Sequence, residues 1–193
     1  TKRSGRDFYF TEDVGHHHTL FIKPQKEMFE KNLKNIWLGT DDAFKLADLK
    51  GKEAWNEIEE DIDANPNLFS KASDGDCYET LKILGCYSPI IHLQQTNGTE
   101  SRHLPFTDEE NFKGKIDGSR ILRSLKESYD RPNEMEMPQK AEKIYLTLEL
   151  FSGTTSIMHN VLEELNKSVE YWRRFIPEDG LRLDELVNRL EKN

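Results

Sequence analysis

Three short apolar runs, separated by longer amphipathic segments, set the hydrophobic pattern of this chain. The runs cover residues 7–14, 89–96 and 144–151, and they are rich in the β-branched and aromatic side chains that favour strands. The second run turns polar abruptly, where Pro-Ile-Ile-His-Leu-Gln-Gln-Thr leads into the loop 97–106. Short apolar runs bounded by turn residues are typical of buried strands in parallel sheets, so we predict three such strands.

Most of the sequence between and after these runs carries apolar residues at helical spacing. Helices are expected at residues 25–37, 40–51 with Thr40 as the cap, 53–64, 77–84, about 121–130, 158 to just before Pro177, and 183–190. Residues 65–76, most of 97–118, and 152–156 are rich in turn-forming residues and are predicted to be loops.

The order of strands and helices predicts an α/β fold with parallel strands. A sheet of three strands leaves both edges unpaired, and parallel sheets are normally covered on both faces. We therefore expect further strands. The chain opens without a methionine and reaches a strand almost at once, which favours the C-terminal part of a longer protein.

The composition and net charge of the chain disfavour several classes of protein. The 193 residues are enough for a hydrophobic core, and the net charge of -9 disfavours nucleic acid and anionic membranes as partners. No run approaches the roughly 20 apolar residues of a membrane helix, and no signal-like stretch opens the chain, so we expect a cytoplasmic protein. The two cysteines, Cys77 and Cys86, have neither disulfide nor metal-site spacing and are expected to be reduced.

Candidate chemistry lies at the ends of the three predicted strands. Asp13 ends the first, His92 lies in the second, and Glu149 lies in the third. These residues are too far apart in sequence for a local metal motif, but parallel strands present the same end to one site. Two carboxylates and an imidazole predict a site for manganese, magnesium, cobalt or zinc.

Four segments of the chain, in this order, carry a resemblance to a known family. They are Asp13-Val14-Gly15-His16; His92-Leu93-Gln94-Gln95 with Arg102 and Pro105 downstream; residues 114–117; and Leu148-Glu149-Leu150. Together they resemble the last three strands of xylose-isomerase-like TIM barrels, a superfamily of sugar isomerases and epimerases that also includes endonuclease IV-like enzymes. The resemblance implies that residues 1–193 form a single partial domain: strands six to eight of a (β/α)8 barrel with their helices, an enlarged helical connection, and the N-terminal strands missing.

The resemblance also implies roles for individual residues. Asp13, His92 and Glu149 would be three of four metal ligands, with a glutamate from an earlier strand as the fourth, and Glu149 would also be a catalytic acid or base. Substrate would be held by a set of polar residues: His16, Gln95, Ser101, Arg102 and His103. The loops after the last two strands are where TIM barrels commonly bind phosphate.

The implied activity is metal-dependent isomerisation or epimerisation of a small sugar or ketose phosphate, such as erythrulose phosphate, through an ene-diolate. One alternative is an endonuclease IV-like phosphodiesterase, although the net charge of -9 disfavours it. A second is an incomplete barrel that is inactive without its N-terminal half. Taken singly, each histidine is as well explained as an ordinary surface or strand-end residue. The expected partner is a small molecule, and a homo-oligomer is possible.

Overall fold

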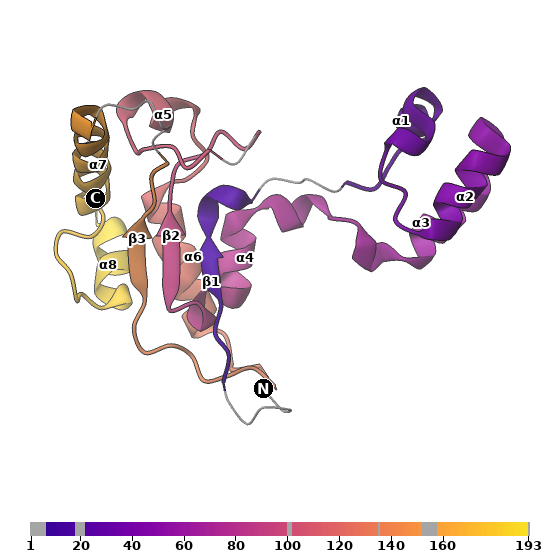
Figure 1. Cartoon of the computed structure of the whole chain (residues 1–193). Helices are drawn as coiled ribbons and strands as arrows, with labels where there is room; N and C mark the ends of the chain where they lie inside the picture. Colours follow the sequence, from indigo (N-terminus) through magenta and orange to yellow (C-terminus); the bar gives the residue numbers. More distant parts are fainter. Residues whose placement is uncertain (1–6, 18–21, 100–101, 135, 152–157, 193) are drawn as a thin grey trace. The chain divides into compact units, whose positions relative to one another are not determined.

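The computed structural model describes residues 7–17, 22–99, 102–134, 136–151 and 158–192. The chain divides into two compact units, which are drawn in Figure 1. Unit 1 comprises Thr1–His18 and Asp76–Asn193, and unit 2 comprises Thr19–Gly75. The segment predicted to be an enlarged helical connection is therefore a compact body of its own, and the single partial domain over residues 1–193 stays a prediction.

Unit 1 is built on a parallel sheet of three strands. These are β1 (Thr11–Asp13), β2 (Ile90–Leu93) and β3 (Tyr145–Leu148), in the order β1-β2-β3. The prediction of an α/β fold with parallel strands is confirmed.

The strands are shorter than the apolar runs that predicted them. The prediction of a strand over residues 7–14 is wrong before Thr11, because the pairing with β2 begins only at Ile90. The chain just before β2 forms a 3₁₀ turn at Gly85–Tyr87, where the Tyr87 carbonyl accepts a hydrogen bond from the Phe10 amide (2.9 Å).

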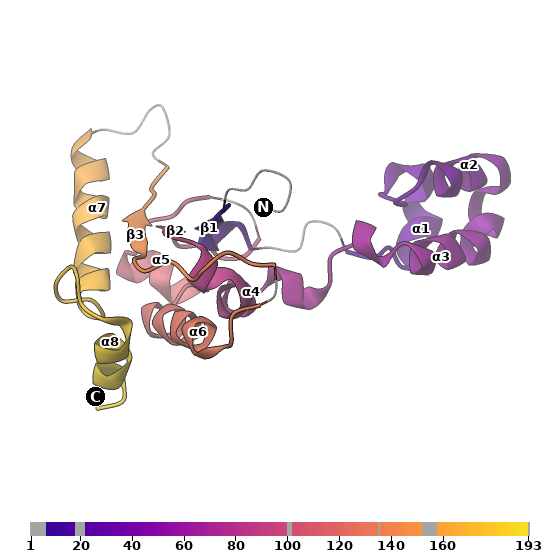
Figure 2. The ribbon, with the colours of Figure 1, turned by 90° about the horizontal axis from the view of Figure 1, so that it is seen from below.

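Helices of unit 1 cover one face of this sheet, and Figure 2 shows α4 and α6 along the same side of the strands. Ile91 and Leu93 of β2 point toward this side and belong to a core that also contains Leu81, Leu125 and Trp172 from three helices. The helices of unit 1 are α4 (Cys77–Leu84), α5 (Asp108–Lys113), α6 (Gly118–Asp130), α7 (Met158–Arg173) and α8 (Leu183–Leu190). All except α5 were predicted.

The opposite face of the sheet carries a different set of side chains. Strand side chains alternate between the two faces, so Ile90 and His92 point away from the helices. Ile90 is 41% exposed and Tyr145, its partner on β3, is 57% exposed. Within the described part of the chain, these two side chains of the face are therefore partly open to solvent.

Unit 2 is helical and has its own core. Its helices are α1 (Lys26–Asn32), α2 (Asp41–Lys50) and α3 (Trp55–Ala64). As predicted, Thr40 caps α2, and its hydroxyl accepts a hydrogen bond from the Ala43 amide (3.1 Å). The buried core consists of Phe29, Leu38, Ala43, Ala47, Ala54, Trp55, Ile58, Ile62 and Phe69. None of the described helices of the chain is both long and apolar enough to cross a membrane.

Candidate metal centre

Strand register places the three predicted metal ligands on one face of the sheet, at its carboxyl end. Asp13 of β1 lies directly opposite His92 of β2, and His92 lies opposite Thr147 of β3. Glu149 follows two residues after Thr147, so its side chain points to the same face. Parallel pairing thus brings together residues that are far apart in the sequence.

The ligand atoms of these residues converge. His92 Nδ1 lies 3.1 Å from Glu149 Oε2 and 3.8 Å from Asp13 Oδ2. Each of these side chains is between a quarter and two fifths exposed, so the group is partly open to solvent. The three residues form a group that could hold a metal ion, with all ligand atoms within 4.8 Å of one another.

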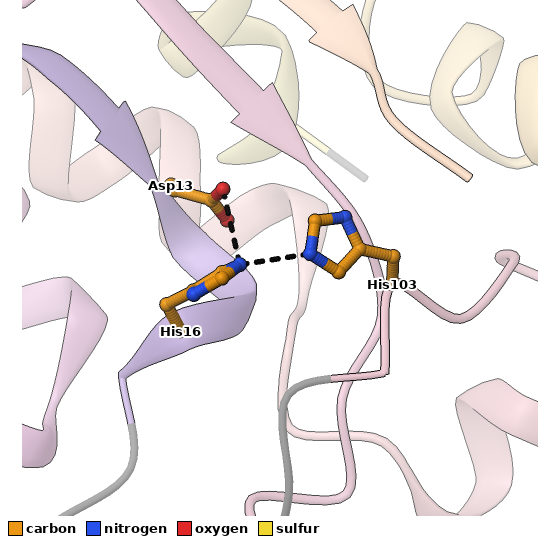
Figure 3. A group of neighbouring side chains, drawn as sticks. All are labelled: Asp13, His16 and His103. Atoms are coloured by element: carbon orange, nitrogen blue, oxygen red, sulfur yellow. Dashed lines mark hydrogen bonds and ion pairs between the residues drawn. The ribbon is translucent and has the colours of Figure 1, made fainter. Parts of the chain in front are cut away.

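Two further histidines join this group, as Figure 3 shows for one side of it. The 3₁₀ turn Val14–His16 after β1 carries His16 back toward Asp13, with its Nε2 3.3 Å from Asp13 Oδ2. His103 comes from the loop after β2. Its Nε2 lies 2.8 Å from the Nε2 of His16, and its Nδ1 lies 3.3 Å from Glu149 Oε2.

The donor set fits a divalent ion. An ion roughly 2.0 to 2.2 Å from each ligand keeps neighbouring ligands about 2.8 to 3.6 Å apart, depending on the geometry. Three separations, 3.1 Å at Glu149 with His92, 3.3 Å at Glu149 with His103 and 3.3 Å at Asp13 with His16, fall in this range. Among the described residues, Glu149 Oε2 and His103 Nδ1 are also buried atoms without a hydrogen-bond partner. Buried polar atoms normally have partners, and a cation would satisfy both of these.

A buried amide orients Asp13. Gln94 is fully buried, and its Nε2 donates to Asp13 Oδ1, which leaves Oδ2 directed at His16 and His92. Gly15 makes room for this amide, because a Cβ at that position would lie 2.8 Å from Gln94 Cδ and 3.0 Å from its Nε2. Such outer contacts fix the orientation of ligands in metal sites.

The loop that carries His103 is closed at its base. Gln95 and Leu104 form an antiparallel bridge with hydrogen bonds of 2.7 and 3.0 Å, which returns the chain to the end of β2. The backbone at His103 has a φ of 29°, a region that residues other than glycine seldom adopt. Its carbonyl accepts a hydrogen bond from the Phe151 amide (3.2 Å), and the two rings pack edge to face 5.5 Å apart.

Gln95, which the resemblance assigns to substrate binding, has a different environment. Its Nε2 donates to Asn111 Oδ1 and to the Ile116 carbonyl, and its Oε1 accepts from the amides of Ile116 and Thr96, at 2.9 to 3.0 Å. These bonds use the hydrogen-bonding capacity of the amide. The structure therefore places Gln95 in the framework of the loop and not among the site side chains.

The remaining predicted site residues lie in the same loop. Arg102 is exposed, and Ser101 lies outside the described residues, as does the predicted phosphate-binding loop 152–156. Sequence reasoning missed Gln94. The two-residue period of a strand carried a signal for it, because that period puts Gln94, and not Gln95, on the face of His92.

A buried tyrosine holds the far end of this loop. The Tyr78 hydroxyl donates to the Lys115 carbonyl (2.6 Å) and accepts from the Asp117 amide (2.8 Å). Burial raises the pKa of Tyr78 to about 12, so the hydroxyl stays neutral and able to donate over the physiological range. The neutral phenol thereby ties α4 to the segment that leads into α6.

No protein-family model matches the chain, and no curated protein matches it.

Proposed function

We propose that the protein is a metal-dependent isomerase or epimerase of a small sugar or ketose phosphate. The observation that carries the proposal is the convergence of Asp13, His92 and Glu149 at the carboxyl end of parallel strands. This is where α/β enzymes place their catalytic groups. Imidazole combined with carboxylates suits manganese, cobalt or zinc, and magnesium where carboxylates dominate.

We also infer that the three strands belong to a (β/α)8 barrel. Two features support this inference: among the described residues, the helices of unit 1 pack on one face of the sheet, and the other face presents the polar site. In a barrel, the face opposite the helices points inward, and the site opens at the carboxyl end.

The reaction needs a base beside a polarised carbonyl. A bound divalent ion would supply Lewis-acid stabilisation of the ene-diolate that forms when a carbon-bound proton leaves the substrate. The buried amide of Gln94 holds Asp13 but not Glu149, the other carboxylate of the group. Glu149 would therefore take up this proton. Return of the proton to the opposite face of the same carbon gives epimerisation. Return to the neighbouring carbon, together with transfer of a proton from one of the two oxygens to the other, gives isomerisation.

The loop after β2 supports a phosphorylated substrate. Arg102 is exposed on this loop, beside His103 of the site. A guanidinium can hold two phosphate oxygens at once, which fixes the substrate while its carbonyl end lies at the metal ligands. The net charge of -9 means that such an anion is held by local groups and not by the overall field.

The direct test is proton exchange at carbon. The protein is incubated in deuterated buffer with Mn²⁺ and a series of three- to six-carbon ketose phosphates, and deuterium incorporation is followed by nuclear magnetic resonance. We expect incorporation next to the carbonyl, and its loss in Glu149→Gln. Glu142→Gln changes an exposed carboxylate just before β3 and is the matched control.

The metal affinity of Glu149→Gln is measured in parallel, so that loss of the base is separated from loss of the ion. No exchange with any ketose phosphate in the metal-loaded protein would contradict the proposal.

A metal-dependent phosphodiesterase is the second candidate. The observation that favours it is the histidine-rich character of the site, where His16, His92 and His103 accompany two carboxylates. Hydrolysis of a phosphodiester bond in an oligonucleotide, without exchange into ketose phosphates, would select this candidate over the isomerase.

A further inference from the structure

We propose that Glu12 and His17 are positioning residues, whose contact closes the chain around residues 13–16 and holds Asp13 and His16 at the site. His17 Nε2 donates a hydrogen bond to Glu12 Oε1, and the two residues directly flank this segment. Neither of them is one of the predicted site residues. The proposal rests on the metal centre of the proposed function, because Asp13 is one of its ligands.

Glu12 is a carboxylate at a position that faces the core. Strand β1 sends alternate side chains to the two faces of the sheet, so Glu12 points toward the helices while Asp13 points toward the site. Glu12 lies opposite Ile91, a fully buried residue of the core, and is itself only 8% exposed. Burying a charge is costly unless the charge is paired. An apolar side chain would suit this position better, so the carboxylate is expected to serve a purpose other than stability.

Two features of the surroundings accommodate the Glu12 carboxylate. The first is His17, whose side chain is 17% exposed and provides the hydrogen bond. The second is the start of α4. Burial raises the pKa of the Cys77 thiol, the first residue of α4, to about 12, and the charges of Asp76 and Glu12 add to this shift. A negative charge near the first turn of a helix is favourable, because the backbone N–H groups point toward it. These contacts offset part of the cost of burying the carboxylate.

The segment between Glu12 and His17 is a tight turn that carries site side chains. Asp13 precedes the 3₁₀ turn Val14–His16, and its side chain does not cap this turn, which leaves the carboxylate for the site. Val14 is fully buried in the same core as Ile91. The contact of Glu12 with His17 thus fastens both ends of the turn, and Val14 anchors its middle.

Asp13 is therefore held from both faces of the sheet. On the site face, the buried amide of Gln94 donates to Asp13 Oδ1. On the helix face, the contact of Glu12 with His17 fixes the backbone on either side of Asp13 and His16. These two side chains face each other, with His16 Nε2 3.3 Å from Asp13 Oδ2 (Figure 3). The first stretch of unit 1 ends one residue after His17, so the contact holds the turn just before the chain passes to unit 2.

The test replaces the polar pair by an apolar pair, in the double variant Glu12→Leu/His17→Leu. Exchange of a buried ion pair for apolar residues of similar size is often neutral or stabilising. In urea denaturation of the metal-free protein, we therefore expect a free energy of unfolding equal to that of the parent or higher. In calorimetric titration, the affinity for Mn²⁺ should fall roughly 10- to 100-fold, the usual effect of losing an outer contact to a metal ligand. If this variant does not fold, Glu12→Gln/His17→Leu takes its place, with the same expected loss of affinity.

Two single variants separate positioning from general stability. Glu12→Gln keeps an acceptor for His17 and should bind Mn²⁺ nearly as tightly as the parent. Ser128→Ala removes a buried hydroxyl that accepts a hydrogen bond from the Cys86 amide (3.0 Å), just before the amino end of β2 and away from the site. This change should lower the free energy of unfolding and leave the affinity for Mn²⁺ unchanged.

Nuclear magnetic resonance of the metal-free protein gives a measurement that does not depend on ion binding. The ring proton and nitrogen signals of His16 and His92 should shift in Glu12→Leu/His17→Leu, because the side chains around Asp13 change their positions. The same signals should stay at the parent positions in Ser128→Ala.

Affinity for Mn²⁺ equal to that of the parent in the folded double variant would overturn the positioning role. An equal loss of affinity in Glu12→Gln or in Ser128→Ala would also overturn it. If the parent itself binds no Mn²⁺, the metal centre of the proposed function fails, and the ring signals then decide the role of the pair. Unchanged signals in the double variant would overturn that role, and shifted signals would support it.

Discussion

The close approach between Gly15 and Gln94 leads to a prediction about Gly15→Ala. The added methyl group would lie 2.8 Å from Gln94 Cδ, 3.0 Å from its Nε2 and closer still to its Cγ. Gln94 is fully buried, so its side chain cannot move out of the way into solvent. The methyl group therefore displaces the amide from Asp13, and Asp13 loses the contact that directs its Oδ2 toward the metal ligands.

The expected effect has two parts. Overpacking of this kind costs about 1 to 3 kcal/mol of the free energy of unfolding. Loss of an outer contact to a metal ligand lowers metal affinity roughly 10- to 100-fold, which corresponds to about 1.4 to 2.7 kcal/mol of binding free energy. Chemical denaturation measures the first quantity, and calorimetric titration with Mn²⁺ measures the second.

Gly180→Ala is the matched control. Gly180 has a φ of 83° and has nothing within 4 Å of the position of an added Cβ, so this change strains the backbone without touching the site. It should cost about 1 to 2 kcal/mol of stability and leave metal affinity unchanged. If Gly15→Ala also binds Mn²⁺ as tightly as the parent, Gln94 does not position Asp13.

Three further predictions concern substrate, helix stability and pH. Arg102→Ala should reduce turnover of phosphorylated substrates far more than that of free sugars, and equal losses for both would remove its phosphate role. Asp117→Ala removes the cap of α6, where the carboxylate accepts from the Arg120 amide (2.9 Å), and should lower the free energy of unfolding by about 1 kcal/mol in urea denaturation. Burial raises the pKa values of Tyr78 and Tyr129 to about 12. Between about pH 10 and pH 12 the unfolded chain therefore loses protons that the folded chain keeps. The free energy of unfolding is unaffected by these tyrosines below about pH 10 and falls as the pH rises toward 12. Unfolding midpoints between pH 9 and 12 test this, and Tyr78→Phe should flatten the decline.

Much of the fold could be predicted because the hydrophobic pattern determines it locally. Trp55, Ile58 and Ile62 recur at helical spacing and are buried in α3, as predicted. The parallel sheet follows from the alternation of strands and helices. Strand ends could not be predicted, because they depend on where the neighbouring chain becomes extended, as at Ile90.

The helix α5 could not be predicted from the hydrophobic pattern. It is only six residues long, its first turn is acidic, and Phe112 is 90% exposed, so it has no apolar stripe. Its start is fixed by the Thr107 hydroxyl, which accepts from the Glu110 amide (3.3 Å). A local cap can form a short helix without leaving a periodic signal in the sequence.

Some residues of the site could be predicted from the local sequence, and the contacts of others depend on the tertiary structure. Asp13, His92 and Glu149 could be selected because each lies near the end of a predicted strand. The contact of His16 with His103 could not, since it depends on a loop that the Gln95 bridge closes. The contact of Gln94 with Asp13 was not predicted, and Gln95, which was predicted to bind substrate, lies in the framework of the loop.

Anomalous diffraction can show whether Asp13, His92 and Glu149 bind a divalent cation. Crystals of the protein grown or soaked with Mn²⁺ are measured on the low-energy side of the iron edge, where manganese scatters anomalously. We expect an anomalous peak about 2.0 to 2.3 Å from Asp13 Oδ2, His92 Nδ1 and Glu149 Oε2, and no such peak in crystals of His92→Ala. Mn²⁺ bound elsewhere on the protein, with none between these three side chains, would contradict it.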